Sequence, residues 1–463
     1  MPVPAHASSS RAACSCTSRS CRCRCWSSSP SRPGPPVPRR WPRPKTPGRG
    51  CGDDLSVARK GHTSPGRWQM RFLHTGDWHL GKALRHHRRD DEFEAVLQEV
   101  LDIARLERVD CLLVAGDVFD SALPPPEAER LAFEFFRELA GARIPAVIIG
   151  GNHDHPRRLN AFGRVLELVG IRVLGEPVPP QEGGVIVVPS RDGEEQAVVA
   201  LFPWMSERRV RTWEGLVRGE GLAEYAQAVG DLLQGLGRFF RRDAVNVLLA
   251  HVLVDGVLVG GEAAGERPLH MGQVYAVPPQ RLPLADYVAL GHVHRHQEVR
   301  NAPTRAVYAG SLLQLDFGEE GQRKCVVLVD AEPGRGVTHL ERIVLSKVRQ
   351  LRTVGLPDRP LSLAELERLR DAPDLRDAYL RVFVKVDGPF PGLAQQVREA
   401  LPNAVEVVPV YPRQEQPSRK RLAGLTPAEL VTLYHRQQYG ADPDPELMSL
   451  FQRLWDEVVH EAH

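Results

Sequence analysis

The stretch Arg71-Phe-Leu-His-Thr-Gly-Asp-Trp-His79 sets the pattern that decides the fold. A short apolar run, typical of a buried strand, is followed by a glycine and then by Asp77 and His79. Polar residues also follow apolar runs at residues 110–115, 146–149, 245–250 and 286–290. These residues are Asp117, Asn152, His153, Asp154, His251, His292 and His294. Because sites in open α/β sheets are built at strand ends, we expect these side chains to lie close together.

Of the nine residues just named, Asp77 and His79 included, seven are candidate metal ligands. Asp, His and Asn without Cys is the donor set of a hydrolytic two-metal centre for manganese, iron or zinc. Any single string could be an ordinary turn or a buried structural histidine, but five strings in one order favour the metal centre. The predicted ligands are Asp77, His79, Asp117, Asn152, His251, His292 and His294.

Residues 1–69 differ in composition from the rest of the chain. They contain 11 Pro, 12 Ser and six of the eight Cys, but no periodic apolar segment. Such a segment cannot bury a core, so we expect it to be disordered. A cysteine-rich metal knuckle and a signal peptide are two other hypotheses, but the former lacks CxxC pairs and the latter lacks an apolar stretch. We favour a start of translation at Met70, directly before the first strand.

The charge of the chain also divides at this point. Residues 1–69 carry 13 Lys and Arg against two Asp, and the whole chain is +2, which leaves residues 70–463 with a net charge of −9. This part is therefore not a generally basic DNA-binding protein. Its only cysteines, Cys111 and Cys325, lie in apolar strands and suggest buried thiols in a reducing cytoplasm. No apolar run is long enough to span a membrane.

The order of expected elements divides the remainder into three parts. Residues 70–345 alternate strands with helices, which we expect at 92–108, 127–139 and 222–240. This order predicts an α/β fold with a sandwich of two sheets flanked by helices. In residues 346–415 we expect a small β-α-β accessory domain, which would cap the domain formed by residues 70–345. In residues 416–463 we expect a polar linker followed by helices, and the first helix would have Thr426 as its N-cap.

The last expected helix carries an apolar stripe. The stripe consists of Leu447, Leu450, Phe451, Leu454 and Trp455, at the spacing of one helical face. It either packs on the accessory domain or binds a partner.

Several strings resemble a known family. Gly150-Gly-Asn-His-Asp154 and the other strand-end strings are similar to the calcineurin-like metallophosphoesterases. Asp77-Trp-His-Leu-Gly81, Gly116-Asp-Val-Phe-Asp120 and Tyr308-Ala-Gly-Ser-Leu-Leu-Gln-Leu-Asp-Phe-Gly318 resemble the SbcD family of bacterial DNA repair nucleases. The resemblance covers residues 70 to about 330 and continues more weakly to the C-terminus. It implies a nuclease with 3′–5′ exonuclease activity on double strands and endonuclease activity on single strands and hairpins.

The resemblance also implies roles for individual residues. One metal ion would take Asp77, His79 and His294, and Mn²⁺ is the ion expected at both sites. The other would take Asn152, His251 and His292, and Asp117 would bridge the two. His153 would protonate the leaving oxygen, and Asp154 would orient His153.

The resemblance further implies partners. They are DNA, a coiled-coil ATPase of the SbcC type, and a second copy of the chain within a heterotetramer at the nucleoid. Gly76-Asp-Trp-His-Leu-Gly-Lys-Ala83 fits a phosphate-loop pattern by chance, because Ala83 replaces the Ser or Thr that holds magnesium, so we expect no ATP site.

Basic residues near the metal strings are candidates for DNA contacts. They are Arg85, Arg88, Arg89, Arg157 and Arg158, with a further basic run at 207–211. Two other functions stay open at this point. A phosphodiesterase for small molecules or cyclic nucleotides could use the same core, and a scaffold could keep the metal only for structure.

Overall fold

The computed structural model describes residues 69–206, 222–259, 276–411, 425–439 and 441–461. The expectations for residues 1–68, for the basic run at 207–211 and for the linker near residue 416 lie outside these ranges. Among the described residues, no helix is both long and apolar enough to cross a membrane.

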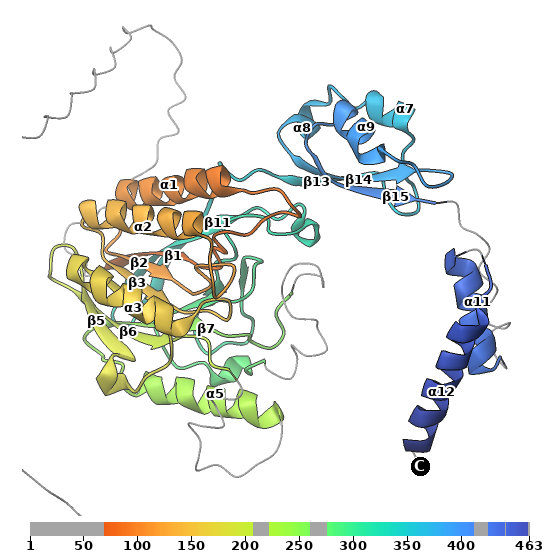
Figure 1. Ribbon diagram of the computed structural model, residues 1–463. Helices are drawn as coiled ribbons and strands as arrows, with labels where there is room; N and C mark the ends of the chain where they lie inside the picture. Colours follow the sequence, from red (N-terminus) through yellow and green to blue (C-terminus); the bar gives the residue numbers. More distant parts are fainter. Residues whose placement is uncertain (1–68, 207–221, 260–275, 412–424, 440, 462–463) are drawn as a thin grey trace, which may run out of the picture. The chain divides into compact units, whose positions relative to one another are not determined.

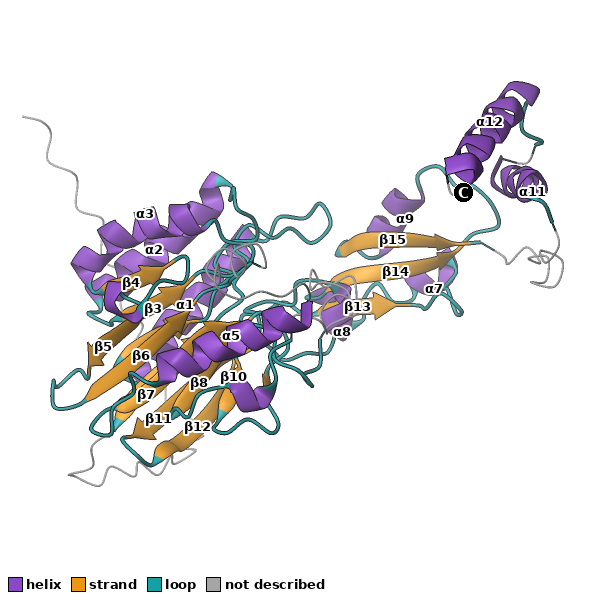
Figure 2. Ribbon diagram, turned by 90° about the horizontal axis from the view of Figure 1, so that it is seen from below, coloured by secondary structure: helices purple, strands orange, loops and turns teal. Residues whose placement is uncertain are grey.

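Two six-stranded sheets form the larger part of the described chain (Figures 1 and 2). The first has the order β12-β11-β1-β2-β3-β4, and its strands β1 to β4 run parallel. Its strands are β1 (Met70–Thr75), β2 (Cys111–Val114), β3 (Ala146–Ile149), β4 (Ile171–Leu174), β11 (Cys325–Glu332) and β12 (Gly336–Val344).

The second sheet has the order β5-β6-β7-β8-β10-β9, with β6, β7, β8 and β10 parallel. Its strands are β5 (Val185–Pro189), β6 (Gln196–Phe202), β7 (Val245–His251), β8 (Tyr287–Gly291), β9 (Gln297–Glu298) and β10 (Ala306–Tyr308).

Helices cover the outer face of each sheet (Figure 1). α1 (Asp90–Leu106), α2 (Pro126–Gly141) and α3 (Pro156–Leu166) pack on the first sheet, and α5 (Leu222–Gly237) packs on the second. In β2, Leu112 and Val114 face the helices, whereas Cys111 and Leu113 face the second sheet. Burial on both faces explains why the strands are continuous apolar runs. The predicted two-sheet sandwich flanked by helices is confirmed.

A third sheet contains three parallel strands in the order β13-β14-β15. These are β13 (Leu351–Val354), β14 (Tyr379–Lys385) and β15 (Ala404–Val410), accompanied by α7 (Leu363–Glu367), α8 (Pro373–Arg376) and α9 (Leu393–Ala400). The predicted β-α-β order accounts for β14, α9 and β15, but it lacks β13. That strand has the sequence Leu-Arg-Thr-Val, and its two polar residues leave no apolar run that could be recognised in the sequence.

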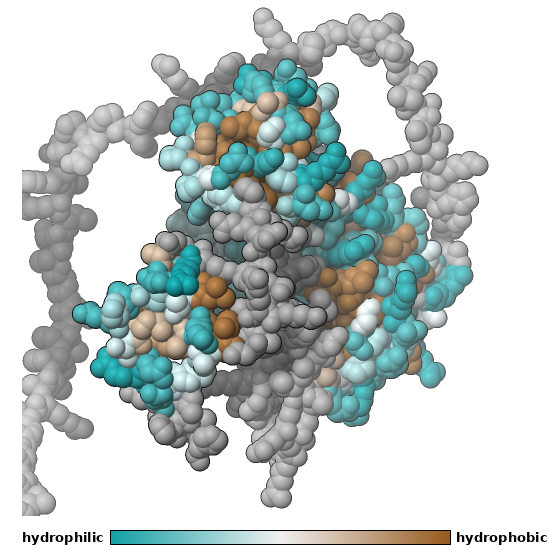
Figure 3. All heavy atoms as spheres, turned by 90° about the vertical axis from the view of Figure 1, so that its right-hand side faces the viewer, coloured by the Kyte–Doolittle hydropathy of each residue, from teal (hydrophilic) through white to brown (hydrophobic). Residues whose placement is uncertain are grey.

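Two helices lie near the C-terminus, α11 (Pro427–Tyr439) and α12 (Pro445–Glu461). Thr426 caps α11 as predicted, because its Oγ1 accepts a hydrogen bond from Glu429 N while Glu429 Oε2 accepts one from Thr426 N. On α12, Leu447, Leu450, Leu454 and Trp455 are all exposed. Apolar side chains also gather in patches between polar ones on the face displayed in Figure 3.

Candidate metal centre

Five loops meet where parallel strands of both sheets end. The loops follow β1, β2, β3, β7 and β8; together with His251, the last residue of β7, they carry all seven predicted ligands. Glycines allow these loops to approach closely. A Cβ at Gly291 would lie 1.9 Å from Ala115 O, and one at Gly151 would lie 2.0 Å from Asp117 Oδ1. Glycine recurs before the ligands because the backbone of one strand end touches that of another.

Four of the predicted ligands have an unusual backbone conformation. Asp77, His79 and Asp117 have φ near +50°, and His292 has φ of +100°. L-residues rarely adopt these values, and each costs on the order of 1–3 kcal/mol. Strain of this kind persists where the surrounding structure imposes it, which is common in functional sites.

Asp117 lies at the centre of the arrangement. Its Oδ2 is 3.6 Å from His79 Nε2 and 3.5 Å from His251 Nε2, so one carboxylate oxygen faces a histidine on each side. Two trios have ligand atoms that all lie within 4.8 Å of one another. One is His79, Asp117 and His153, and the other is Asp77, Asp117 and His251. A carboxylate shared between two groups of donors can bridge two cations.

The other predicted ligands complete the two sides. On one side, His79 Nε2 and His294 Nε2 face each other at 3.1 Å. On the other, Asn152 Oδ1 lies 3.1 Å from His251 Nε2 and 2.8 Å from His292 Nδ1. The structure therefore brings together all seven residues that the strand-end pattern selected.

The donors fit a divalent metal. Within the described part of the chain, the buried Asp77 Oδ2 has no hydrogen-bond partner, an arrangement that is costly unless a cation lies nearby. Burial lowers the pKa of His79 and lowers that of His292 to about 3, so both rings are neutral, as metal ligands must be. Burial also opposes the charge of Asp117, but His251 holds the pKa of this carboxyl well below its usual value.

His153 and Asp154 differ in their surroundings. His153 Nδ1 lies 2.7 Å from Asp120 O, to which it can donate, and its ring is half-buried beside His79. Because Nδ1 is engaged in this way, Nε2 is the His153 ring nitrogen that can act in the metal centre. The prediction that Asp154 orients His153 is wrong. Asp154 instead accepts hydrogen bonds from the backbone of Val118, Phe119 and Gly151, so it ties the loop after β2 to the loop after β3.

Three further residues support the ligands and were not predicted. Glu319 Oε1 is 2.9 Å from His294 Nδ1, and Trp204 stacks on the His292 ring. Asp120 Oδ1 lies 3.3 Å from His79 Nδ1. Partners of this kind fix the orientation of a ligand ring. They are distant in sequence or lie in loops without a repeated pattern, so no sequence signal identifies the pairings.

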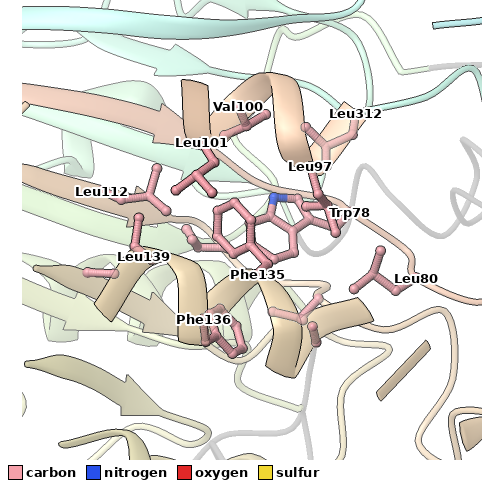
Figure 4. Packing of buried hydrophobic residues seen from close by; sticks show 14 of the residues in the cluster. Trp78, Leu80, Leu97, Val100, Leu101, Leu112, Phe135, Phe136, Leu139 and Leu312 are labelled. Carbon is pink, nitrogen blue, oxygen red and sulfur yellow. The ribbon is translucent and has the colours of Figure 1, made fainter. Parts of the chain in front are cut away.

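Trp78 anchors the first loop from the core side (Figure 4). Trp78 lies between Asp77 and His79 in the sequence, and its indole is fully buried. Its Nε1 donates to Thr75 Oγ1 at 3.1 Å. Its ring packs edge to face against Phe135 of α2, with 5.2 Å between the centroids. The two ligands that flank Trp78 are thus fixed to the core beneath helices α1 and α2.

The candidate DNA-contacting arginines are held in different ways. Arg89 is buried, and its guanidinium donates to Glu92 and to Gln314 O, so the prediction that it contacts DNA is wrong. Arg85 pairs with Asp316 and Glu406, and Arg88 with Asp90 and Glu127. Arg158 pairs with Glu129, whereas Arg157 is exposed at the start of α3.

Comparison with known families assigns the class. A model described as calcineurin-like phosphoesterase matches residues 70–296. A second, described as the type 5 capsule protein repressor C-terminal domain, matches residues 348–439. Together with the grouped metal donors, the first match makes this chain a calcineurin-like phosphoesterase, a metal-dependent phosphodiester hydrolase.

Three curated relatives are each named as the SbcD subunit of the nuclease SbcCD. The protein of Bacillus subtilis (strain 168) is 35% identical over 85% of this chain and 99% of its own length. The Rhodobacter capsulatus protein is 33% identical over 77% of this chain and 87% of its own. The Escherichia coli (strain K12) protein is 28% identical over 84% of this chain and 98% of its own length. The chain belongs to the SbcD family.

Proposed function

We propose that this chain is the nuclease subunit of an ATP-dependent DNA repair complex and that it hydrolyses phosphodiester bonds of DNA at the site around Asp117. The observation that carries the proposal is the meeting of seven metal donors from both sheets, with the Asp117 carboxylate between the other six. In support, relatives named as nucleases match along almost their whole length, the third sheet included. The proposed activities are 3′–5′ exonuclease on double strands and endonuclease on single strands and hairpins.

The proposed ligands form two sets. Asp77, His79 and His294 would hold one divalent cation, and Asn152, His251 and His292 the other. Asp117 would bridge them, in keeping with its oxygen between His79 and His251. Hard carboxylate and amide oxygens mixed with imidazole suit Mn²⁺, which we propose as the metal. When bound, such a pair supplies a nucleophile from water at neutral pH and neutralises the phosphate oxygens.

The chain itself contributes proton transfer. His153 Nδ1 is engaged by Asp120 O, so the opposite ring nitrogen can donate a proton to the leaving oxygen of the cleaved strand. Asp154 fixes the two loops that carry Asp117 and Asn152, so we propose for it a positioning role through the backbone. Glu319 would hold His294 in the orientation that presents Nε2.

DNA contacts would come from the basic residues at the rim. We propose Arg157 first, because its side chain is exposed directly after the loop that carries Asn152. Arg85, Arg88 and Arg158 are each paired with carboxylates, so a phosphate would have to replace those partners.

Partner binding would use two apolar surfaces. The stripe on α12 would dock on an ATPase of the SbcC type, because Leu447, Leu450, Leu454 and Trp455 are exposed there. A second copy would pack on exposed apolar residues of α2, α3 and the short helix after α3. These are Phe133, Val165, Leu168 and Val169. We propose residues 70–345 as nuclease domain, 346–415 as accessory domain and 416–463 as the partner-binding part, in a cytoplasmic, nucleoid-associated complex.

A comparison of substrates tests the proposal. The purified chain, with manganese, is assayed on hairpin DNA, single-stranded DNA and bis-p-nitrophenyl phosphate. We expect cleavage of both DNAs, abolished by EDTA and restored by manganese. Hydrolysis of the aryl diester without cleavage of either DNA would contradict the nuclease and favour a small-molecule phosphodiesterase. Copurification with a coiled-coil ATPase tests the partner separately.

A further inference from the structure

A polar pocket is lined in part by the two residues that follow the proposed ligand His294. It has a volume of about 530 Å³ and is lined by Arg295, His296, Arg323, Arg342 and Glu320, among others. Its walls come from the segment after β8, from the loop that precedes β11, and from β12. None of these residues belongs to the seven proposed ligands or to the basic residues selected from the sequence.

The charge of this pocket is positive. Arg295, Arg323 and Arg342 are all exposed, and within the described part of the chain none of the three forms an ion pair with a carboxylate. Arg342 donates to Arg323 O at 2.5 Å, which holds its guanidinium beside the loop. The lining carboxylate, Glu320, is occupied by a hydrogen bond from Thr353 N at 3.1 Å. Three guanidinium groups therefore line the pocket with one carboxylate, Glu320, and none of them forms an ion pair with it.

The pocket is tied to the metal centre through His294. Arg295 directly follows this ligand, and His296 Nδ1 lies 3.0 Å from Tyr308 O. The buried Lys324, which follows the lining residue Arg323 in the chain, donates from Nζ to His294 O at 3.0 Å and pairs with Glu319 at 2.6 Å. Glu319 in turn contacts His294 Nδ1. The segments that line the pocket are thus the same ones that orient a proposed ligand.

Arginine forks match the geometry of phosphate oxygens and form strong charge-assisted hydrogen bonds. A nucleic-acid strand presents further phosphates on both sides of the bond being cleaved, and contacts to them fix its register without reading sequence. We infer that this pocket binds a backbone phosphate near the scissile one and holds the strand in register with the metal centre. The inference rests on the proposed nuclease function and assigns a substrate-positioning role to Arg295, Arg323 and Arg342.

A double variant tests the inference. In Arg295→Gln/Arg323→Gln, we expect KM for a single-stranded oligonucleotide to rise about tenfold or more. The ratio of kcat/KM for the oligonucleotide to that for bis-p-nitrophenyl phosphate should fall by the same factor, because the aryl diester has no second phosphate. The slope of log KM against log salt should flatten by about 0.7, because one phosphate contact is lost. The matched control is Arg238→Gln/Arg300→Gln, which removes two exposed arginines outside the pocket and should keep the ratio.

Neutral linkages locate the phosphate. Single methylphosphonate linkages are placed in turn along the oligonucleotide. At one position, the methylphosphonate should raise the KM of the wild-type protein about tenfold and that of the double variant hardly at all. The neutral linkage and the arginine substitutions remove the same contact. Equal losses in both proteins at every position would overturn the inference. So would an equal loss on oligonucleotide and aryl diester, which would mean that the arginines act only through His294.

Two further measurements separate other outcomes. Binding of a phosphorothioate oligonucleotide is followed by anisotropy; if the wild-type protein binds but never cleaves DNA, the nuclease proposal fails, while weaker binding by the double variant still supports the pocket. Inorganic phosphate is tested as a competitor. If it binds at the arginines while the oligonucleotide KM is unchanged in the double variant, the pocket takes a free anion and the inference is overturned.

Discussion

At the scale of single residues, the candidate centre combines backbone strain with buried polar groups. Asp77, His79, Asp117 and His292 have left-handed backbone, and their side chains converge on one point. Hydrogen bonds between loops hold this geometry, for example from His292 N to Asp77 Oδ1 at 2.8 Å. Contacts with the surrounding structure therefore stabilise a backbone conformation that these residue types would not adopt by themselves.

His292 allows this strain to be measured. His292→Gly and His292→Ala remove the same imidazole contacts, but only glycine relieves the positive φ. Relief of strain outweighs the higher entropy of unfolded glycine, so His292→Gly should be more stable than His292→Ala by about 1 kcal/mol. Urea denaturation in EDTA measures the difference. At His294, which is not among the residues with positive φ, the order should reverse; the same order at both positions would contradict the strain argument.

His153 allows the proposed proton donor to be separated from the ligands. His153→Ala should lower kcat for DNA by about 10²–10⁴ while both cations stay bound, because only proton donation is lost. Metal content by mass spectrometry and the cleavage rate are measured on one preparation. His339→Ala, on the exposed part of β12, serves as the control. Since His153 also lies close to His79 and Asp117, loss of a cation in His153→Ala would make it a ligand instead.

At the scale of elements, the strand ends place the ligands and the core beneath them fixes the loops. Trp78 connects the core to the loop that carries two ligands, because it is buried under α1 and α2 while its neighbours in sequence face the site (Figure 4). Loss of packing in this position should therefore change both stability and metal binding.

Trp78→Ala tests this connection. Removal of a fully buried indole should cost about 3–5 kcal/mol of unfolding free energy and should weaken metal binding by loosening Asp77 and His79. Phe239→Ala, at an aromatic ring that is 42% exposed, should have a small effect on both. Thermal melting and manganese titration give the two quantities. A destabilised variant with unchanged metal affinity would show that the loop holds its geometry without the indole.

The elements also show how far the sequence predicts the structure. Strands buried on both faces are uninterrupted apolar runs, even in the four residues of β2 and of β3, so their ends, and with them the seven donors, could be predicted. β13 could not, because two of its four residues are polar and leave no apolar run. The pairing of Glu319 with His294 could not either, because a contact between loops has no local signature. Asp154 directly follows His153 in the sequence, but the backbone amides of Val118 and Phe119 in another loop donate to its carboxylate.

At the scale of the whole molecule, α12 tests the proposed assembly. Phe451→Ala/Trp455→Ala should weaken binding of the partner ATPase by several kcal/mol, because large aromatic residues concentrate binding energy. The melting temperature of the isolated chain should hardly change, since Trp455 is 42% exposed. Gln452→Ala/Asp456→Ala, a hydrogen-bonded polar pair on the same helix, is the control. Lower melting with unchanged affinity would instead mean that the stripe packs within the chain.

The most direct test of the central claim titrates manganese into the metal-free protein and into Asp117→Asn while cleavage of single-stranded DNA is followed. We expect two cations per wild-type chain, with cleavage that appears as they bind. In the variant we expect weaker binding of both cations and no detectable cleavage, because the shared carboxylate is lost. Cleavage at the full wild-type rate in EDTA, or an Asp117→Asn protein that keeps both cations and its rate, would contradict a metal centre bridged by Asp117.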